Sequence, residues 1–342
     1  MASETRTRPL ALPGPGGQGV TRMHGRGPTL ARLDRPTAAS TTLAVVADLH
    51  LATASRGTWK CFHRTGDRLR AVVREVNRLA VDGLVLAGDL THTGRADQYD
   101  ALRRALGDLV VPVMAVPGNN DLRSANPPEG ADALHGFAPG DLPQVQRFGD
   151  VTVLGIDSAG LGAGKPPRHG CVGPDQREQI SELVDDADVD LAVLHHSLAD
   201  DALVGGRGVP DPTALAGSDE LAELLDGAGV DLAVSGHTHC PALGRRRGLR
   251  EIVAPAACSF PPSFLLVHVE PRGTTVSMVP IVDRLGLEEA YQYALDGPDR
   301  ARRIAEAFTG GYLDRFPLVD ELDDEFPTPA APGAADLVRL PR

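Results

Sequence analysis

The sequence predicts an α/β protein built on a mixed sheet, and three observations lead to that prediction. Apolar segments of strand length alternate with amphipathic segments of helix length between residues 42 and 235. Three further apolar segments follow one another between residues 251 and 279, which indicates successive antiparallel strands. Polar side chains come directly after several of the strands, as they do where a ligand binds at the carboxyl edge of a sheet.

Strands are expected where short apolar runs are bounded by turn-forming or charged residues. Helices are expected where apolar residues recur three or four positions apart, as Leu69, Val72, Val73 and Val76 do. In chain order this gives a strand at 42–47, a helix at 65–80, a strand at 84–87, a helix at 99–106 and strands at 112–116 and 151–156. A helix at 175–184, a strand at 189–194, a helix at 218–225 and strands at 230–235, 251–254, 263–269 and 274–279 follow. The stretch between 117 and 149 predicts no regular element.

The two ends of the chain differ in composition from this alternating region. Residues 1–40 hold five prolines and six glycines, carry a net charge of +4 and lack apolar periodicity, so we expect a flexible arginine-rich tail. A single domain is expected over 41–285. Residues 286–342 predict a helical segment followed by an acidic, proline-rich tail or loosely docked strap.

Composition excludes several classes of protein. The formal net charge of −12 argues against a general nucleic-acid binder, whose surface should be basic. The four cysteines show no Cys-x-x-Cys spacing, which indicates reduced thiols and not a disulfide framework. No apolar run resembles the core of a signal peptide or reaches the length that spans a membrane. We therefore expect a cytoplasmic protein without a membrane partner.

Five of the predicted strands are each followed by side chains that can bind a metal ion. These groups are Asp48-Leu49-His50, Gly88-Asp89, Gly118-Asn119-Asn120-Asp121, His195-His196 and Gly236-His237-Thr238-His239. Because ligands of α/β sheets bind at the carboxyl ends of strands, we expect the five groups to converge on one rim. In Asp-x-His and His-x-His, alternate side chains of an extended segment would point to the same side. The glycines before Asp89, Asn119 and His237 allow sharp turns and close approach of the backbone.

Such a convergence requires a cation. Several buried carboxylates would repel one another and lose their solvation unless positive charge compensated them. Neutral imidazole together with carboxylate and amide oxygen atoms suits manganese, iron, zinc or related divalent ions. The sequence therefore predicts a metal site at this edge.

The order Asp-x-His, Gly-Asp, Gly-Asn-x-Asp, His and Gly-His-x-His resembles that of the calcineurin-like metallophosphoesterases. The resemblance spans about Thr41 to Val282, and the five blocks together are specific although each alone is weak. It implies a four-layer αββα sandwich with two mixed sheets and a dinuclear metal site at the carboxyl ends of the strands. It also implies hydrolysis of a phosphoric ester by a metal-bridging hydroxide. The implied cofactors are two divalent ions: manganese, an iron and manganese pair, or zinc.

The resemblance assigns seven metal ligands by position. One ion would be bound by one set of side chains, the other ion by a second set, and a shared carboxylate would bridge them. The first set is Asp48, His50 and His239, the second is Asn119, His195 and His237, and the bridge is Asp89. His195 matches the ligand position better than His196, which alternation along the strand would turn away. His196 and Arg123 are candidate substrate contacts.

One departure from the family pattern bears on catalysis. Asn120 stands where the family usually has a histidine near the leaving group, and Asp121 stands where an aspartate orients that histidine. Asparagine can donate a hydrogen bond but cannot deliver a proton, and general acid catalysis is typically worth about 10²–10⁴-fold. His92, three residues after Asp89, is a candidate substitute, and the alternative is a histidine without a chemical role.

These features favour hydrolysis of a phosphodiester such as a cyclic nucleotide or a glycerophosphodiester, with Asn120 among the substrate contacts. The alternatives are a phosphomonoesterase or protein phosphatase of the same fold, and a metal-binding scaffold without activity. A degenerate scaffold would have lost ligands, whereas every ligand position is filled here. The expected partner is a small phosphoester, nucleotides included. The sequence leaves the natural substrate and the oligomeric state open.

Overall fold

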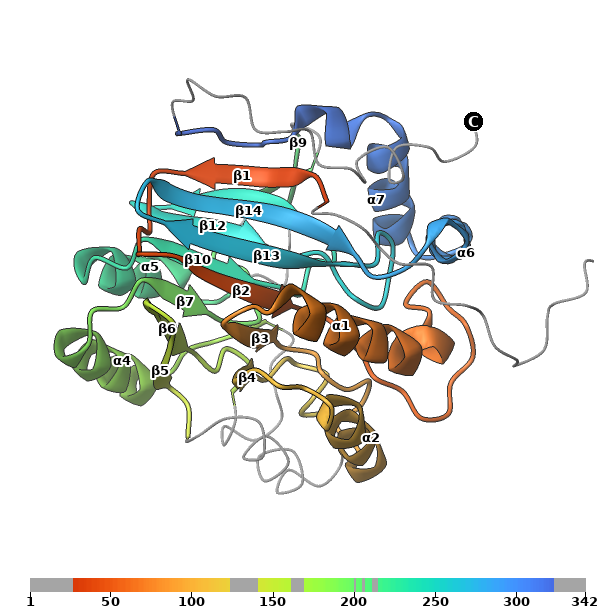
Figure 1. The fold of residues 1–342 in the computed structure, drawn as a ribbon, viewed down its shortest axis with the longest axis horizontal. Coiled ribbons are helices and arrows are strands. Elements are labelled where there is room, and N and C mark those ends of the chain that lie inside the picture. The colour runs from red at the N-terminus through yellow and green to blue at the C-terminus, as the bar shows by residue number, and fades with distance from the viewer. Residues whose placement is uncertain are drawn as a thin grey trace, which may run out of the picture.

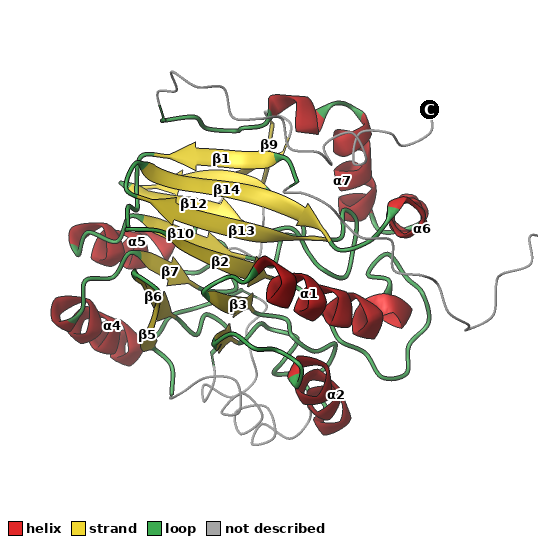
Figure 2. Cartoon of the chain, viewed as in Figure 1, coloured by secondary structure: helices red, strands yellow, loops and turns green. Residues whose placement is uncertain are grey.

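The computed structural model describes residues 27–123, 141–160, 169–199, 201–204, 207–210 and 215–322. Two six-stranded mixed sheets form the centre of the molecule, and helices lie outside them (Figures 1 and 2). The expected tails at residues 1–26 and 323–342 lie outside the described residues. No helix in the described part of the chain is both long enough and apolar enough to cross a lipid bilayer.

The first sheet has the strand order β1-β14-β13-β2-β3-β4. Its strands are β1 (Thr29–Leu33), β2 (Thr41–Val46), β3 (Gly83–Ala87), β4 (Val113–Val116), β13 (Ser263–Glu270) and β14 (Gly273–Pro280). β2, β3 and β4 are parallel, so their carboxyl ends meet at the same edge. β13 pairs antiparallel with β2, and β14 pairs antiparallel with both β13 and β1.

The second sheet has the order β11-β12-β10-β7-β6-β5. Its strands are β5 (Gln144–Phe148), β6 (Val151–Gly155), β7 (Leu191–Val193), β10 (Leu232–Ser235), β11 (Ala242–Arg246) and β12 (Leu249–Val253). β6, β7, β10 and β12 are parallel, and β5 and β11 run antiparallel at the two edges. A separate hairpin joins β8 (Asp201–Val204) to β9 (Arg207–Pro210).

Three apolar layers hold the sandwich together. Between the sheets, side chains such as Val85 and Met114 from the first sheet pack with Val193 and Val234 from the second. The apolar faces of α1 (Thr65–Leu79) and α2 (Ala96–Leu106) cover the outer face of the first sheet. α4 (Pro174–Asp186) and α5 (Ser218–Gly227) cover the second sheet. The four-layer αββα architecture implied by the resemblance is confirmed.

The carboxyl-terminal helices are part of this core. α6 (Arg284–Leu295) and α7 (Asp299–Thr309) bury Leu287, Ile304 and Phe308 in the cluster between the sheets, and the short helix η2 (Tyr312–Arg315) follows. Figure 1 shows them beside the loop that leads into α1. At that contact Glu289 of α6 pairs with His63 and Arg64 of the short helix η1 (Phe62–Arg64).

The expectation of a tail over residues 1–40 is wrong for residues 29–33, which form β1. Leu30, Ala31 and Leu33 are fully buried, and β1 pairs with β14, about 240 residues away. Because the partner is so distant in sequence, no local pattern revealed this strand. Residues 318–321 run along the other side of β1, where the N–H of Leu318 donates to the carbonyl of Leu30 at 2.8 Å.

Most of the predicted helices and strands are present within a few residues of their predicted ends. β5 lies in the stretch for which no regular element was expected, and β11 was not predicted at all. The prediction of three successive antiparallel strands is right for β13 and β14 only. β12 belongs to the other sheet, where it pairs parallel with β10, because the chain crosses between the sheets after Val253.

Candidate metal centre

The polar groups that follow five strands meet where the two sheets join. Asp48, Asp89 and Asn119 follow β2, β3 and β4 of the first sheet, and His195 and His237 follow β7 and β10 of the second. Two hydrogen bonds link the sheets there. The N–H of His237 donates to Asp48 Oδ2 at 2.8 Å, and His195 Nδ1 donates to the carbonyl oxygen of Ala87 at 3.0 Å. The predicted convergence on one rim is therefore present.

One cluster contains Asp48, His50 and His239. The Nε2 atom of His239 lies 3.1 Å from Asp48 Oδ1, and the Nε2 atom of His50 lies 3.6 Å from the same oxygen. Ser259 Oγ lies 2.7 Å from His239 Nδ1 and holds the ring from behind. Cys258 also lies within reach of this cluster, but burial raises the pKa of its thiol, which disfavours the thiolate that a metal would need.

A second cluster contains His195, His196 and His237, whose ligand atoms lie within 4.8 Å of one another. His195 Nε2 lies 3.3 Å from His237 Nδ1. Because a carbonyl oxygen only accepts, His195 Nδ1 must carry the proton that it donates to Ala87, and its Nε2 lone pair faces the cluster. This is the tautomer that a metal ligand requires.

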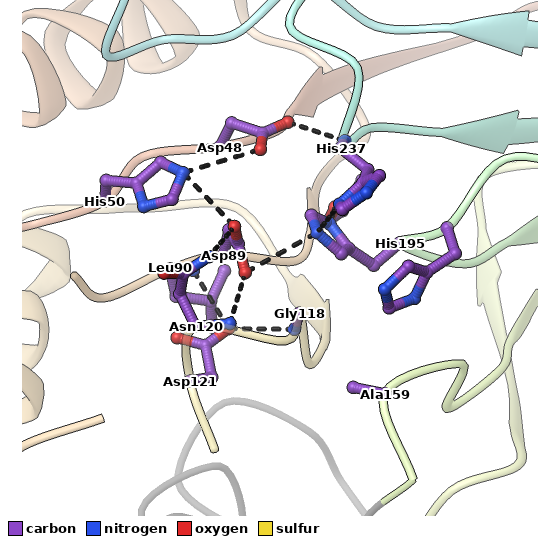
Figure 3. A network of polar contacts seen from close by, with 12 residues as sticks. Asp48, His50, Asp89, Leu90, Gly118, Asn120, Asp121, Ala159, His195 and His237 are labelled. Atoms are coloured by element: carbon purple, nitrogen blue, oxygen red, sulfur yellow. Dashed lines mark hydrogen bonds and ion pairs between the residues drawn. The ribbon is translucent and has the colours of Figure 1, made fainter. Parts of the chain in front are cut away.

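Asp89 lies between the two clusters, as Figure 3 shows. Its Oδ2 atom is 3.2 Å from His50 Nε2 in the first cluster, and its Oδ1 atom is 3.5 Å from His195 Nε2 in the second. The side chain is 2% exposed, so this carboxylate is shielded from water. Each oxygen therefore faces a different candidate ligand set, which is the position of a bridging carboxylate.

Several buried polar atoms at this site have no hydrogen-bond partner. They include Oδ1 of Asp48 and Oδ1 of Asn119. An unpaired acceptor that is buried costs about 1–3 kcal/mol, and more when it is charged. Asp48 Oδ1 lies 3.1 Å from His239 Nε2 and 3.6 Å from His50 Nε2, so a cation bound among these atoms would satisfy it. The donor set of carboxylate, amide oxygen and imidazole therefore fits divalent metal ions.

The backbone at the site is unusual. Five candidate ligands have a positive φ: Asp48 (53°), His50 (43°), Asp89 (51°), His237 (67°) and His239 (62°). The expectation that Asp-x-His and His-x-His reach the metal from an extended segment is therefore wrong. A left-handed residue at each of these positions aims the side chain inward instead. For a residue with a Cβ atom this conformation costs roughly 1–2 kcal/mol, which tertiary contacts must offset.

Two glycines make the close approach of strands possible, as the sequence predicted. A Cβ atom on Gly88 would collide with the imidazole of His195, and one on Gly118 would collide with the backbone and the carboxylate of Asp89. Gly88 also has a φ of 84°, which favours glycine. Both positions bring ligands from different strands into contact.

Burial keeps most of the imidazoles neutral. It lowers the pKa of His239 to about 3, although the Asp48 carboxylate opposes this, and it lowers the pKa values of His50 and His237. A neutral imidazole offers a lone pair to a metal without first losing a proton. These side chains are therefore ready to bind a metal at neutral pH.

The buried carboxylates and the imidazoles beside them shift one another's pKa values. Burial acts against its charge, yet His239 and His50 hold the pKa of Asp48 well below its usual range. Burial likewise opposes the charge on His195, but Asp89 and Asp48 together raise its pKa. The two carboxylates thus favour a proton on His195, and a metal ion bound there would take the place of that proton.

Asn120 and Asp121 do not point at an open reaction space. The N–H of Asn120 donates to Asp89 Oδ1 at 2.8 Å, and its Nδ2 donates to Oδ2 at 2.5 Å. Arg123 Nη1 in turn donates to Asn120 Oδ1 at 2.9 Å. The Asp121 carboxylate accepts hydrogen bonds from the N–H groups of Leu90, Thr91 and Gly118 and from the Thr91 hydroxyl. Asn120 therefore positions Asp89, and Asp121 braces the loops around it (Figure 3).

His196 is not turned away from the site, contrary to the expectation from strand alternation. Its ring lies 4.7 Å from the ring of His237. Ser158 Oγ accepts the N–H groups of His195 and His196, so its own proton is directed to His196 Nδ1 at 3.0 Å. In the neutral ring this leaves the proton on Nε2, a buried atom without a partner. His196 thus presents a donor, whereas His195 presents a lone pair.

His92 lies at the margin of the first cluster. Its ring packs 4.0 Å from the ring of Phe62 and 6.5 Å from that of His50. Burial, assisted by the nearby His50, lowers the pKa of His92 to about 4. An imidazole that is neutral at pH 7 is a weak proton donor, which disfavours His92 as the substitute general acid.

Several residues at the site were not predicted. Trp59 packs its ring 5.0 Å from that of His239, and Lys60 Nζ lies 2.9 Å from His50 Nε2. Arg300 of α7 donates to the carbonyl oxygens of His237 at 2.6 Å and Thr238 at 3.0 Å. These residues follow no predicted strand, so the rule about strand ends could not find them. The one available signal was that the chain has a single tryptophan and very few lysines.

Glu251 of β12 was missed as well. Its buried carboxylate accepts hydrogen bonds from the hydroxyls of Ser197 and Ser235 and from the N–H groups of Leu198 and Ala199. It thereby fixes the turn that follows His195 and His196. An acidic residue inside a predicted strand was the available signal.

Comparison with known proteins agrees with this geometry. A family model described as calcineurin-like phosphoesterase matches residues 41–241, more than half of the chain. The chain therefore belongs to the calcineurin-like phosphoesterase family, as the order of its motifs predicted. It is a hydrolase that acts on phosphoester bonds.

Individual relatives are more distant. Over 252 residues the chain is 27% identical to a protein from Synechococcus sp. named probable cyclic nucleotide phosphodiesterase, a match that covers 71% of this chain and 92% of the relative. A dimetal phosphatase from Danio rerio has a similar fold, with a TM-score of 0.52 and 17% identity over 71% of this chain and 99% of that one. A purple acid phosphatase from yellow lupin gives a TM-score of 0.51 and 14% identity over 72% and 52%. These two structures support the fold alone.

Proposed function

We propose that this protein hydrolyses phosphodiesters with the help of two divalent metal ions. The observation that carries the proposal is the position of Asp89, whose two oxygen atoms face His50 in one cluster and His195 in the other. Cations on both sides would compensate the charge of a buried carboxylate that is shared in this way. The clusters on either side supply further ligands for each ion.

Asp48, His50 and His239 would hold one ion, and Asn119, His195 and His237 would hold the other. When bound, such a pair supplies an activated water molecule and positive charge for the phosphoryl oxygens. The protein orients these ligands from outside, through Ser259 behind His239 and Ala87 behind His195. Manganese, iron and zinc all suit this donor set, and we favour manganese or an iron and manganese pair.

The substrate side of the site supports a diester. His196 Nε2 is a buried donor without a partner beside the second cluster, where a phosphoryl oxygen could accept its proton in a hydrogen bond. Asn120 gives both of its donated hydrogen bonds to Asp89 and cannot protonate a leaving group. Esters with good leaving groups depend least on such a proton. The printed name of the Synechococcus relative, a probable cyclic nucleotide phosphodiesterase, points the same way.

A phosphomonoesterase of the same fold is the second candidate, because nothing in the ligand set distinguishes the two ester classes. A metal-binding scaffold without activity is less well supported, since each of the seven ligand positions is filled. Nucleotides are the substrates we favour. The proposal keeps the cytoplasmic location, which the four free cysteines suit.

The test is a substrate comparison with metal-reconstituted protein. Protein stripped with a chelator is reloaded with manganese, iron or zinc and assayed on bis(4-nitrophenyl) phosphate, 4-nitrophenyl phosphate, cyclic nucleotides and glycerophosphodiesters. We expect diesters to be cleaved with the higher kcat/KM. Faster cleavage of monoesters would favour the second candidate. Loss of all hydrolysis with two ions bound would favour the scaffold.

A further inference from the structure

Lys60 directs its ammonium group into the first metal cluster. Its Nζ atom lies 2.9 Å from His50 Nε2, the atom that also faces Asp48 and Asp89. An ammonium group has protons to donate and no lone pair, so Lys60 donates and His50 accepts. The lysine therefore occupies a position on the same side of His50 as the candidate metal site.

The ammonium group of Lys60 lacks an anionic partner of its own. Among the described residues no carboxylate forms an ion pair with it, and its remaining close side-chain contact is the ring of Trp59, 5.2 Å from Nζ. Asp89, which faces the same His50 atom, is a candidate metal ligand, and once metal ions compensate its charge a half-buried cation beside it is stabilised by an anion brought to the site.

The loop that carries Lys60 is fixed by packing on both sides. A Cβ atom on Gly57 would overlap the Tyr293 hydroxyl of α6, and one on Gly297, between α6 and α7, would overlap Trp59 Cβ. Lys60 N–H donates to Thr58 Oγ1 at 3.2 Å. The backbone therefore holds Trp59 and Lys60 against the first cluster, while the flexible lysine side chain can still change its direction.

We propose that Lys60 is a substrate-binding residue that pairs with a phosphoryl oxygen of the ester. A metal ion at the first cluster would take the His50 lone pair and repel the ammonium group. A phosphate bound at the metals would then give the ammonium group an anionic partner. Lys60 in this way supplies the positive side chain that Asn120, bonded to Asp89, does not supply. This inference rests on the proposed phosphoesterase function.

Trp59 makes the proposal measurable apart from catalysis. It is the only tryptophan of the chain, and it touches both His239 and Lys60. Its fluorescence therefore reports directly on events at this half of the site. Trp59→Phe should abolish the signal and so verify its source.

The experiment titrates inorganic phosphate into manganese-saturated protein and follows Trp59 fluorescence, with metal content measured on the same samples. The variants are Lys60→Met, which keeps much of the stem without the charge, and Lys60→Arg, which keeps the charge. Arg56→Met, at an exposed position of the same loop, removes one positive charge elsewhere. In parallel, KM and kcat are measured with bis(4-nitrophenyl) phosphate.

We expect Lys60→Met to weaken phosphate binding and to raise KM by about tenfold or more, as the loss of a charge-assisted hydrogen bond should. Lys60→Arg should recover much of the affinity, and Arg56→Met should stay within about twofold of wild type. Wild-type phosphate affinity and KM in Lys60→Met, with two ions bound, would overturn the inference while the proposed function stands. A wild-type protein that cleaves no ester would instead overturn the proposed function.

Discussion

Asn120 clamps Asp89 with two hydrogen bonds, one to each carboxylate oxygen, from its backbone N–H at 2.8 Å and its side-chain amide at 2.5 Å. The residue that replaces the family histidine thus acts on the candidate bridging ligand. Arg123 donates to the same side chain from the far side. The three residues form a short chain of contacts that ends at the candidate metal centre.

This chain of contacts predicts coupled effects of mutation. Asn120→Ala should lower diesterase kcat/KM about tenfold, because it removes a hydrogen bond to a charged group. Arg123→Ala should cost less, since the arginine is exposed and acts through Asn120. In a double-mutant cycle, Arg123→Ala should have almost no further effect once Asn120 is alanine. Additive losses would show that Arg123 reaches the substrate independently.

The position of Asp89 predicts that the two ions are bound interdependently. Wild type should contain about two ions per chain, and Asp89→Ala should lose both together while its far-ultraviolet circular dichroism stays near that of wild type. Asp89→Asn, which keeps the shape but not the charge, should retain less metal than wild type and more than Asp89→Ala. Metal analysis of purified protein checks this. An active wild type with a single ion would be incompatible with a bridging role.

The contacts of Arg300 predict that α7, which lies outside the matched residues 41–241, affects metal binding. Its two hydrogen bonds hold the carbonyl oxygens of His237 and Thr238. Arg300→Met should therefore weaken manganese binding about tenfold, measured by calorimetry. Arg303→Met, at an exposed position of the same helix, is the matched control and should bind manganese normally. Equal affinity in both variants would mean that the turn holds its shape without α7.

The left-handed backbone at His239 predicts that a glycine variant is more stable there than an alanine variant, the reverse of the usual order. In metal-free protein, His239→Gly should be more stable than His239→Ala by about 1 kcal/mol, because glycine adopts a φ of 62° without strain. His196 is not among the residues with a positive φ, so there His196→Gly should be the less stable of the pair. Denaturant unfolding after chelation measures both differences. The same sign at both positions would refute the argument.

The buried imidazoles predict how the stability of the metal-free protein depends on pH. Burial lowers the pKa values of His196 and His239 to about 3 each, so both stay neutral when folded but take up protons near pH 6.5 when unfolded. The folded protein therefore has its full stability above about pH 6.5, and it loses stability as the pH falls and the unfolded chain takes up these protons. At pH 5.5 His196 and His239 should each lower the free energy of unfolding by about 1 kcal/mol. His50 and His237 act in the same direction, and the raised pKa of His195 opposes them.

The observable is the Tm of chelated protein, which should fall between pH 7.5 and pH 5.5. His196→Gln removes one of the titrating groups and should make the fall shallower. A Tm that rises toward acid pH would mean that His195 and Asp121, whose pKa burial raises to about 6, outweigh the four neutral rings.

The convergence of the candidate ligands was predictable from the sequence, because local patterns encode their positions. Asp48, Asp89 and His195 each come directly after a run of buried apolar residues, and parallel strands end at a common edge. The four layers followed from the family resemblance carried by the same motifs. The positive φ of Asp48 and His50 was not predictable, because aspartate and histidine adopt that conformation only occasionally and the contacts that impose it come from other strands.

The residues that were missed depend on packing between distant segments. Lys60 lies in a loop whose position is set by α6, more than 220 residues later, and Arg300 reaches the site only because α7 docks on the core. β1 was missed for the same reason. Its five residues are too few to show a clear period, and its partner β14 lies far along the chain. A single sequence read locally cannot supply such contacts.

The segment 318–321 beside β1 affects the tendency of the protein to aggregate. β1 ends the first sheet, and an uncovered strand at that place would offer a row of free N–H and C=O groups to another molecule. Residues 318–321 take up that row, through bonds between Leu318 and Leu30 and between Arg32 and both Val319 and Glu321. Asp320 then pairs with Arg32 and Glu321 with Arg250, which hold the segment in place. The acidic segment therefore shields the molecule from edge-to-edge aggregation, a role separate from any chemistry at the metals.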